Sequence, residues 1–282
     1  MIELPETYVL SEQVNKTLSG KTIARAYANT HPHGFATYTG DPATYNERLT
    51  GKKVTGSSPG TPNTCGRHVE ILCGDMMLTV STPIKYHAPG AKLPKSHQLL
   101  LEFGDGSHMS CSVQMWGSML CYPPDTSGRP CSICPVCKKA PTPYDDAFSE
   151  AYFSELFSSV KQSMSVKEFI ATDQRIPGIG NGVLQDVLWN AGVHPRRRLE
   201  TFSANERSKL YQSLKSTLLA MREQGGRDTE KDLFGNPGGY KTILSKKTLE
   251  APCQRCGSQI IRQAYLGGNI YYCPTCQPQA GS

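Results

Sequence analysis

The stretch that decides the fold is Cys253-Gln-Arg-Cys256, followed by residues 257–272 and then by Cys273-Pro-Thr-Cys276. Two CxxC pairs at this spacing are typical of a zinc ribbon, because each pair forms a tight knuckle that directs both thiolates at one tetrahedral ion. Four unrelated thiols or two disulfides are the alternatives, and the spacing favours zinc in a chain that reads as intracellular. Four protein ligands close the coordination shell, so this ion would be structural.

The residues between the two cysteine pairs predict a β-hairpin. Ile260-Ile261 lies on one arm, Ile270-Tyr-Tyr272 lies on the other, and Gly267-Gly-Asn269 supplies the turn. A ribbon of this size cannot bury a core of its own, so the bound metal would supply its folding energy.

Size and composition bound the function. The chain has 282 residues, enough for two domains, and its net charge of +6 suits a nucleic-acid partner. Its eleven cysteines and a start without a basic and apolar leader predict a reduced, cytoplasmic protein. No run approaches the roughly 20 apolar residues of a membrane span, so we expect no membrane partner.

The first half of the chain predicts one helix and then a β-rich region. Residues 5–18 predict the helix, with Pro5 in its first turn. Short apolar runs predict strands at Val69–Leu72, Met76–Val80, Leu99–Phe103 and Met109–Tyr122. Phe103-Gly-Asp-Gly-Ser107 predicts a hairpin turn, and the Pro-, Ser- and Cys-rich residues 123–145 predict a linker.

From about residue 146 the apolar period becomes helical. Ser165-Val-Lys-Glu168 fits a capping box that opens a helix, residues 173–180 interrupt it, and Asn181–Asn190 predicts a second helix. Ser203-Ala-Asn-Glu206 caps a third helix, which Gly225-Gly226 ends. The sequence therefore predicts an α+β protein whose domains are residues 1–135, 146–247 and 248–282.

The N-terminus is the first candidate for chemistry. An α-amine titrates near pH 8 and a lysine near 10.4, so more of the α-amine is neutral and nucleophilic at pH 7. Such an amine can attack a sugar C1′ and form a Schiff base, while the nearby Glu3 could protonate the sugar ring oxygen. The alternative is that Glu3 and Glu6 are ordinary acids of a first helical turn, which spacing alone favours.

Two further motifs suggest contacts with DNA. The loop Ile176-Pro-Gly-Ile-Gly-Asn181 opens a helix and could hold a phosphate on the amides of Gly178 and Gly180, or it could be a tight interhelical turn. Arg196-Arg-Arg198 adds charge, although arginine runs are more often solvated surface. Gln114, Met115 and Trp116, in Val113-Gln-Met-Trp-Gly117, could wedge into a base stack, whereas spacing alone favours a core strand.

A second cysteine group could bind another metal. Cys131, Cys134 and Cys137 could hold a second zinc or an iron–sulfur cluster, with Cys121 or Cys111 near, or they could be free thiols.

In this order, these elements resemble the formamidopyrimidine-DNA glycosylase and endonuclease VIII family. The matching motifs are Glu3-Leu-Pro-Glu6, Ile179-Gly-Asn181, Asn190-Ala-Gly-Val-His-Pro195, Glu223-Gln-Gly-Gly226, Pro237-Gly-Gly-Tyr240 and the ribbon from Pro252. The resemblance runs from residue 1 to about 277. It implies an N-terminal helix, a two-layered β-sandwich, a helical domain with a helix–two-turn–helix motif and a C-terminal zinc β-hairpin, with damaged DNA between the domains.

The resemblance also implies an activity and its residues. Family members remove oxidised bases and then cleave the abasic strand through a Schiff base on the mature N-terminal amine, with the following glutamate as the acid/base group. The expected catalytic residues are Glu3, Ile2, Glu6, Lys53 and Arg67. The expected DNA-binding residues are Asn181, Gln114, Met115, Trp116, Tyr240, Lys241 and Arg262.

Two departures from the family pattern concern the nucleophile and a lysine. Ile2 stands where the family usually has its nucleophilic proline, and if Met1 is retained the amine lies up to ~3.6 Å from its usual place. Arg67 falls at the position of the family's hairpin lysine, with Lys52 and Lys53 close by in the sequence. Arginine stays protonated and can hold a phosphate, but it is no replacement nucleophile.

A third departure is the tip of the zinc hairpin. The family usually places an arginine there, whereas this chain has Gly267-Gly268, and Arg262 is the nearest basic residue. Lys241 could compensate for the missing charge.

The leading hypothesis is a monomeric, nucleoid-associated DNA repair glycosylase that flips a damaged base from DNA, with weak or absent lyase activity. The alternative is a catalytically silent damaged-DNA-binding protein of the same fold, which the three departures favour. An RNA-binding zinc-ribbon protein is the third hypothesis, and the order of the motifs speaks against it.

Overall fold

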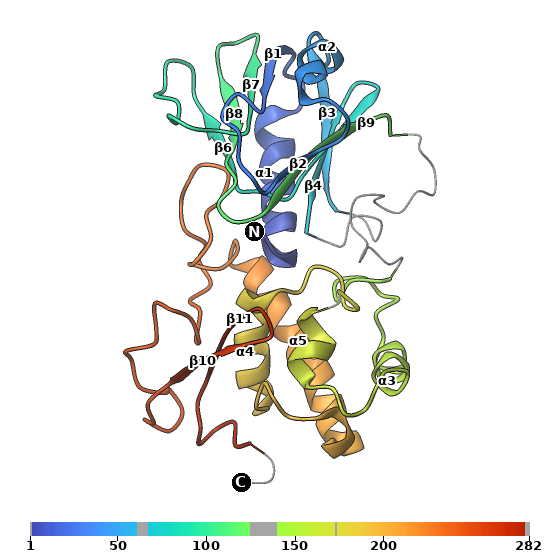
Figure 1. The fold of residues 1–282 in the computed structure, drawn as a ribbon, viewed down its shortest axis with the longest axis vertical. Helices are drawn as coiled ribbons and strands as arrows, with labels where there is room; N and C mark the ends of the chain where they lie inside the picture. Colours follow the sequence, from blue (N-terminus) through green and yellow to red (C-terminus); the bar gives the residue numbers. More distant parts are fainter. Residues whose placement is uncertain (1, 61–66, 125–139, 173, 280–282) are drawn as a thin grey trace.

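The computed structural model describes residues 2–60, 67–124, 140–172 and 174–279. A β-rich half carries the N-terminus and a helical half carries the C-terminal hairpin, and α1 (Leu4–Leu18) runs through the β-rich half (Figure 1). This helix confirms the prediction for residues 5–18, and Pro5 stands in its first turn. It packs against β3 and β4 of one sheet and against α5 of the helical half.

Two sheets form the β-rich half, which confirms the expected two layers. One sheet has the strand order β1-β7-β8-β6 and the other has the order β2-β9-β5-β4-β3. The strands are β1 (Ile23–Ala28), β2 (Ala36–Tyr38), β3 (Val54–Pro59), β4 (Val69–Cys73), β5 (Met76–Val80), β6 (Ile84–His87), β7 (Leu99–Phe103), β8 (His108–Cys111) and β9 (Gly117–Tyr122). A short 3-10 turn η1 (Pro42–Thr44) and helix α2 (Tyr45–Leu49) precede β3. All pairings are antiparallel except that of β2 with β9.

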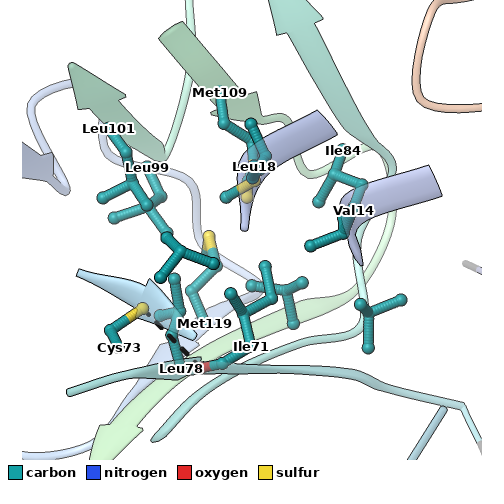
Figure 2. Close-up of a cluster of buried hydrophobic side chains, with 14 of the residues drawn as sticks. Val14, Leu18, Ile71, Cys73, Leu78, Ile84, Leu99, Leu101, Met109 and Met119 are labelled. Atoms are coloured by element: carbon teal, nitrogen blue, oxygen red, sulfur yellow. Dashed lines mark hydrogen bonds between the residues drawn. The ribbon is translucent and has the colours of Figure 1, made fainter. Parts of the chain in front are cut away.

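The core of this half lies between α1 and the two sheets. Figure 2 shows Val14 and Leu18 of α1 among side chains of both sheets, including Ile71, Leu78 and Leu101. All five side chains are at most 1% exposed. Helix α1 is therefore held by the burial of apolar area on its inner face.

The strand predictions were accurate except around residue 112. Met76–Val80 and Leu99–Phe103 are confirmed, and the Asp-Gly turn joins β7 to β8 with the amide of Phe103 donating to the carbonyl of Ser107. The run predicted at Met109–Tyr122 is two strands, β8 and β9, because residues 112–116 leave the sheet.

The helical half is built around a second apolar core. Its elements are α3 (Glu150–Ser158), η3 (Glu168–Thr172, a π-helical turn), α4 (Asn181–Ala191), η4 (Leu199–Thr201) and α5 (Ala204–Glu223). The predicted capping box of α5 is confirmed, with Ser203 and Glu206 each accepting an amide of the other. At Ser165 only one half of the predicted box is found, since its hydroxyl accepts the amide of Glu168, and the helix there continues as the π-helical turn.

The C-terminal hairpin consists of β10 (Ile261–Tyr265) and β11 (Gly268–Tyr272). Its two-residue turn is Leu266-Gly267, both with positive φ (46° and 70°), so the turn predicted at Gly267-Gly-Asn269 is wrong by one residue. Gly268 and Asn269 pair within the ladder. The hairpin docks on α4 because Gln185 donates to the carbonyl of Asn269 and accepts the amide of Tyr271. No helix among the described residues is both long and apolar enough to cross a membrane.

Candidate active site

The carboxylate of Glu3 caps the N-terminus of α4. Its two oxygens accept the amides of Gly180 (3.1 Å), Gly182 (2.9 Å) and Val183 (2.9 Å). The backbone is fixed here as well, because the amide of Leu4 donates to the carbonyl of Gly178 at 2.9 Å. The first amides of a helix have no partner within the helix and carry its positive dipole end, so a carboxylate is a favourable partner.

This contact corrects the phosphate-site interpretation of residues 176–181. The amide of Gly180, assigned to a phosphate from the sequence, already donates to Glu3. The side chain of Asn181 remains available, since it is exposed and lines the cavity described below. The anion at this helix terminus is therefore one of the protein's own carboxylates.

A buried arginine joins the two N-terminal glutamates. Arg227 is 2% exposed, and its guanidinium donates to both oxygens of Glu6 at 2.9 and 2.8 Å. Its Nη1 lies 3.7 Å from Oε1 of Glu3. Gly182 leaves room for this group, because a Cβ there would lie 1.6 Å from Nη1. Glu6, expected to be catalytic, is thus the anchor of a buried ion pair.

The surroundings keep Glu3 ionised. Burial raises its pKa, but the charges of Arg227 and Arg67 and the amides of Val183 and Gly182 together outweigh burial and lower the pKa below its ordinary value. Arg67 also donates from Nη2 to the carbonyl of Ile179 at 2.6 Å, which attaches the start of β4 to the loop before α4.

A cavity of about 580 Å³ opens beside these groups. Four of the expected site residues line it, namely Glu3, Arg67, Met115 and Asn181. The structure therefore brings together residues from the N-terminus, the β-rich half and the helical half. Most of the residues that line it carry polar or charged side chains, which can hydrogen-bond a polar ligand.

Other expected catalytic residues lie elsewhere. The side chain of Ile2 is 2% exposed and belongs to the core of the β-rich half. Lys53 precedes β3, where its carbonyl accepts the amide of Gly74, whereas Arg67 lies at the opposite end of the β3–β4 pair. Lys53 is consequently separated from the cavity by the length of a strand.

Expected DNA-binding residues of the helical half and the hairpin, namely Tyr240, Lys241 and Arg262, are also outside the cavity wall. Tyr240 is 8% exposed and belongs to the apolar core of the helical half, so its side chain is largely buried. Lys241 is exposed. Arg262 is exposed on β10 and donates from Nε to the side chain of Asn269 at 3.1 Å.

Residues 114–116 are exposed, so the core reading that spacing favoured is wrong. Met115 is 72% exposed and Trp116 is 55% exposed, and Gln114 is exposed beside them. The ring of Trp116 lies 4.4 Å from that of Phe35, which is itself 51% exposed. Large apolar side chains gathered in the open make this surface a candidate for contact with a ligand.

Sequence reasoning missed most of the cavity wall, including the charged residues Lys167, Arg227 and Glu230. Lys167 is 1% exposed and donates to the carbonyl of Tyr265, and burial lowers its pKa. It lies inside the Ser165–Glu168 motif, whose sequence predicts only a helix start. Arg227 directly follows Gly225-Gly226, the glycines that end the helix. Nothing in the sequence around this single charged residue indicates that its side chain is buried.

The four ribbon cysteines form a site that fits zinc. Their sulfurs all lie within 4.8 Å of one another, with Cys253 and Cys276 separated by 3.8 Å and Cys256 and Cys273 by 3.4 Å. A tetrahedral ion with Zn–S bonds of ~2.3 Å requires sulfurs about 3.8 Å apart, whereas a disulfide requires ~2.0 Å. The disulfide alternative is therefore wrong for this group. Cys131, Cys134 and Cys137 lie outside the described residues.

Comparison with known proteins agrees with the fold. No protein-family model matches the chain. Curated relatives named formamidopyrimidine-DNA glycosylase include those of Enterococcus faecalis (24% identical, covering 100% of this chain and 99% of the relative) and Geobacillus kaustophilus (26%, covering 98% and 100%). A solved complex of Lactococcus lactis Fpg with DNA containing an abasic site matches with a TM-score of 0.81 at 22% identity, covering 98% of this chain and 100% of that chain.

Proposed function

We propose that the protein is a DNA repair glycosylase that removes damaged bases, because these comparisons support the formamidopyrimidine-DNA glycosylase and endonuclease VIII family for this chain. The observation that carries the proposal is the ionised Glu3 at the wall of a 580 Å³ cavity, joined there by Asn181 and Arg67. The resemblance gives these same positions roles in base removal.

In this proposal a damaged nucleotide leaves the duplex and enters the cavity. Met115 and Trp116, which are exposed, would fill the space that the nucleotide leaves and stack on its neighbours. The exposed amide of Asn181 would donate to a backbone phosphate. Lys241 and Arg262, both exposed, would add backbone contacts.

Glu3 would act mainly through its charge. As the bond between base and sugar breaks, positive charge develops on C1′ and the ring oxygen. A carboxylate that is already ionised and held by three amides can stabilise that charge without reorganising.

Cleavage of the abasic strand is a separate proposal. It requires a neutral terminal amine that attacks C1′ and forms a Schiff base. Because the usual proline is missing, we expect lyase activity to be weaker than base removal.

The ribbon cysteines would hold one structural zinc ion. The four thiolates would close its shell, and the ion would stabilise the small core that joins the hairpin to α4 at Trp189. We also propose that the three chain segments 1–135, 146–247 and 248–282 are the domains.

One observation favours a second candidate, a silent binder of damaged DNA. Both glutamates of the N-terminus are engaged by other protein groups, Glu3 by amides and Glu6 by Arg227. A protein that only recognises damage would tolerate such engagement.

A trapping experiment separates these functions. The protein is incubated with duplexes that carry an oxidised purine, an oxidised pyrimidine or an abasic site, with and without borohydride. Strand breaks that appear only after alkali, without a covalent adduct, support a glycosylase that lacks lyase activity. A borohydride-stabilised adduct on the N-terminal peptide adds the lyase. Tight binding without base loss or adduct on every duplex contradicts the proposed function and supports the silent binder.

A further inference from the structure

Three carboxylates share one buried guanidinium beside the cavity. The guanidinium of Arg227 donates two hydrogen bonds to Glu6 and lies 3.7 Å from Glu3 and 4.0 Å from Glu230. Glu3 has three amides as further partners. Among the described residues, no hydrogen bond reaches the carboxylate of Glu230. Of the three carboxylates, Glu230 therefore interacts most weakly with the guanidinium.

We propose that Glu230 is the general acid of this site and that it carries the proton transferred to the leaving base. This inference rests on the proposed glycosylase function and assigns a step of it to a residue outside the N-terminal motif. Glu230 lines the cavity together with Glu3, and its side chain is 29% exposed, so it reaches the space that a flipped base would occupy.

The electrostatic surroundings agree with this assignment. Burial raises the pKa of Glu230, Arg227 and the terminal amine lower it, and the negative charges of Glu6 and Glu3 raise it, with a net rise. Lys231 lies beside Glu230 on the same loop, and the cavity wall also carries Arg67, Lys167 and Lys246. The negative charges of Glu6 and Glu3 therefore make ionisation of Glu230 costly.

The two acids of the cavity, Glu3 and Glu230, thus have different roles. Glu3 has its pKa lowered and stays a carboxylate, whereas Glu230 has its pKa raised and can hold a proton. Pairs of carboxylates whose surroundings move their pKa values apart commonly serve as charge stabiliser and general acid.

The proposed step balances in atoms and charge. The bond between C1′ and the base nitrogen breaks, and its electron pair goes to that nitrogen, which takes the proton of Glu230. A water molecule forms the new bond to C1′ through its oxygen. The proton that this water loses returns to the Glu230 carboxylate, so that the acid is restored.

The test is the single-turnover rate of base release as a function of pH, with the protein in excess over a duplex that the wild type cleaves. The variants are Glu230→Gln, Glu230→Asp and, as a matched control, Glu223→Gln, which changes an exposed carboxyl at the end of α5. Melting temperature and binding to abasic-site DNA show that each variant is folded.

We expect the wild-type rate to fall as pH rises through the pKa of Glu230, because the acid must be protonated. Glu230→Gln should be slower by about 100- to 10,000-fold and should lose this alkaline limb. Glu230→Asp should be slow but keep the limb, and Glu223→Gln should match the wild type.

Two results would overturn the inference. If Glu230→Gln releases base at the wild-type rate with an unchanged pH profile, the inference is wrong while the glycosylase function stands. If the wild type releases no base from any duplex, both fail together.

Discussion

Replacing Arg227 by methionine should severely destabilise the protein. The guanidinium is 2% exposed and makes two short hydrogen bonds to Glu6. Removing one partner of a buried ion pair costs about 3–5 kcal/mol, because the other charge stays buried without compensation. For a chain of this size that loss lowers the melting temperature by on the order of 10 °C. Urea unfolding of Arg227→Met at pH 7, with the wild type beside it, measures the loss of free energy.

A second variant isolates the cause of that loss. Arg227→Met combined with Glu6→Leu removes both charges of the hydrogen-bonded pair and fills the space with apolar groups, while Glu3 keeps its three amide partners, so part of the lost stability should return. A loss below about 1 kcal/mol for Arg227→Met, or a double variant no more stable than the single one, would refute the reasoning about this buried pair.

Three shorter predictions concern the hairpin, the apolar surface and the capping box. Chelation of zinc should release the hairpin and shift the fluorescence of Trp189 to the red. Because the chain has 2 tryptophans, the measurement uses a Trp116→Phe background. Unchanged emission after complete metal removal would contradict a structural role for zinc. Trp116→Ala should weaken binding to abasic-site duplex by about 1–3 kcal/mol in a titration while leaving the melting temperature unchanged, since the ring is 55% exposed; an equal loss of stability would instead indicate a packing role. Arg197 and Ser203 lower the pKa of Glu206 to about 2, below its ordinary value. The ionised Glu206 carboxylate should therefore stabilise the protein fully above about pH 4.5, and this contribution should be lost as pH falls towards 2. The difference in melting temperature between wild type and Glu206→Gln should narrow over that range, and a constant difference would argue against this role of Glu206.

The sequence predicted local structure well wherever the spacing of apolar residues agreed with the residues that start and end an element. Helix α5 has its capping serine, its apolar spacing and its terminal glycines in one continuous segment, and all were found in place. The zinc ribbon was equally readable, because ligand spacing is a local property. The turn of the hairpin was placed one residue late, since three consecutive turn-forming residues allow more than one register.

The site itself was only partly readable, because its groups meet through tertiary contacts. Glu3 was expected from the N-terminal motif, but nothing local shows that its carboxylate caps α4, 177 residues away. Burial of Arg227 depends on Gly182 and Glu6, which are far from it in sequence. Local apolarity alone favours a core position for Trp116, whereas the bend at residues 112–116 leaves it exposed.

The measurement that tests the central claim most directly is detection of the free damaged base. Protein in excess is incubated with a duplex that holds one isotopically labelled oxidised base, and the small-molecule fraction is analysed by mass spectrometry. The account predicts that wild-type protein releases free base in equal amount to the abasic sites formed, and that Glu3→Gln, shown to be folded by its melting curve, releases far less. A stable complex of wild-type protein with the duplex, and no free base from any lesion, would contradict a glycosylase.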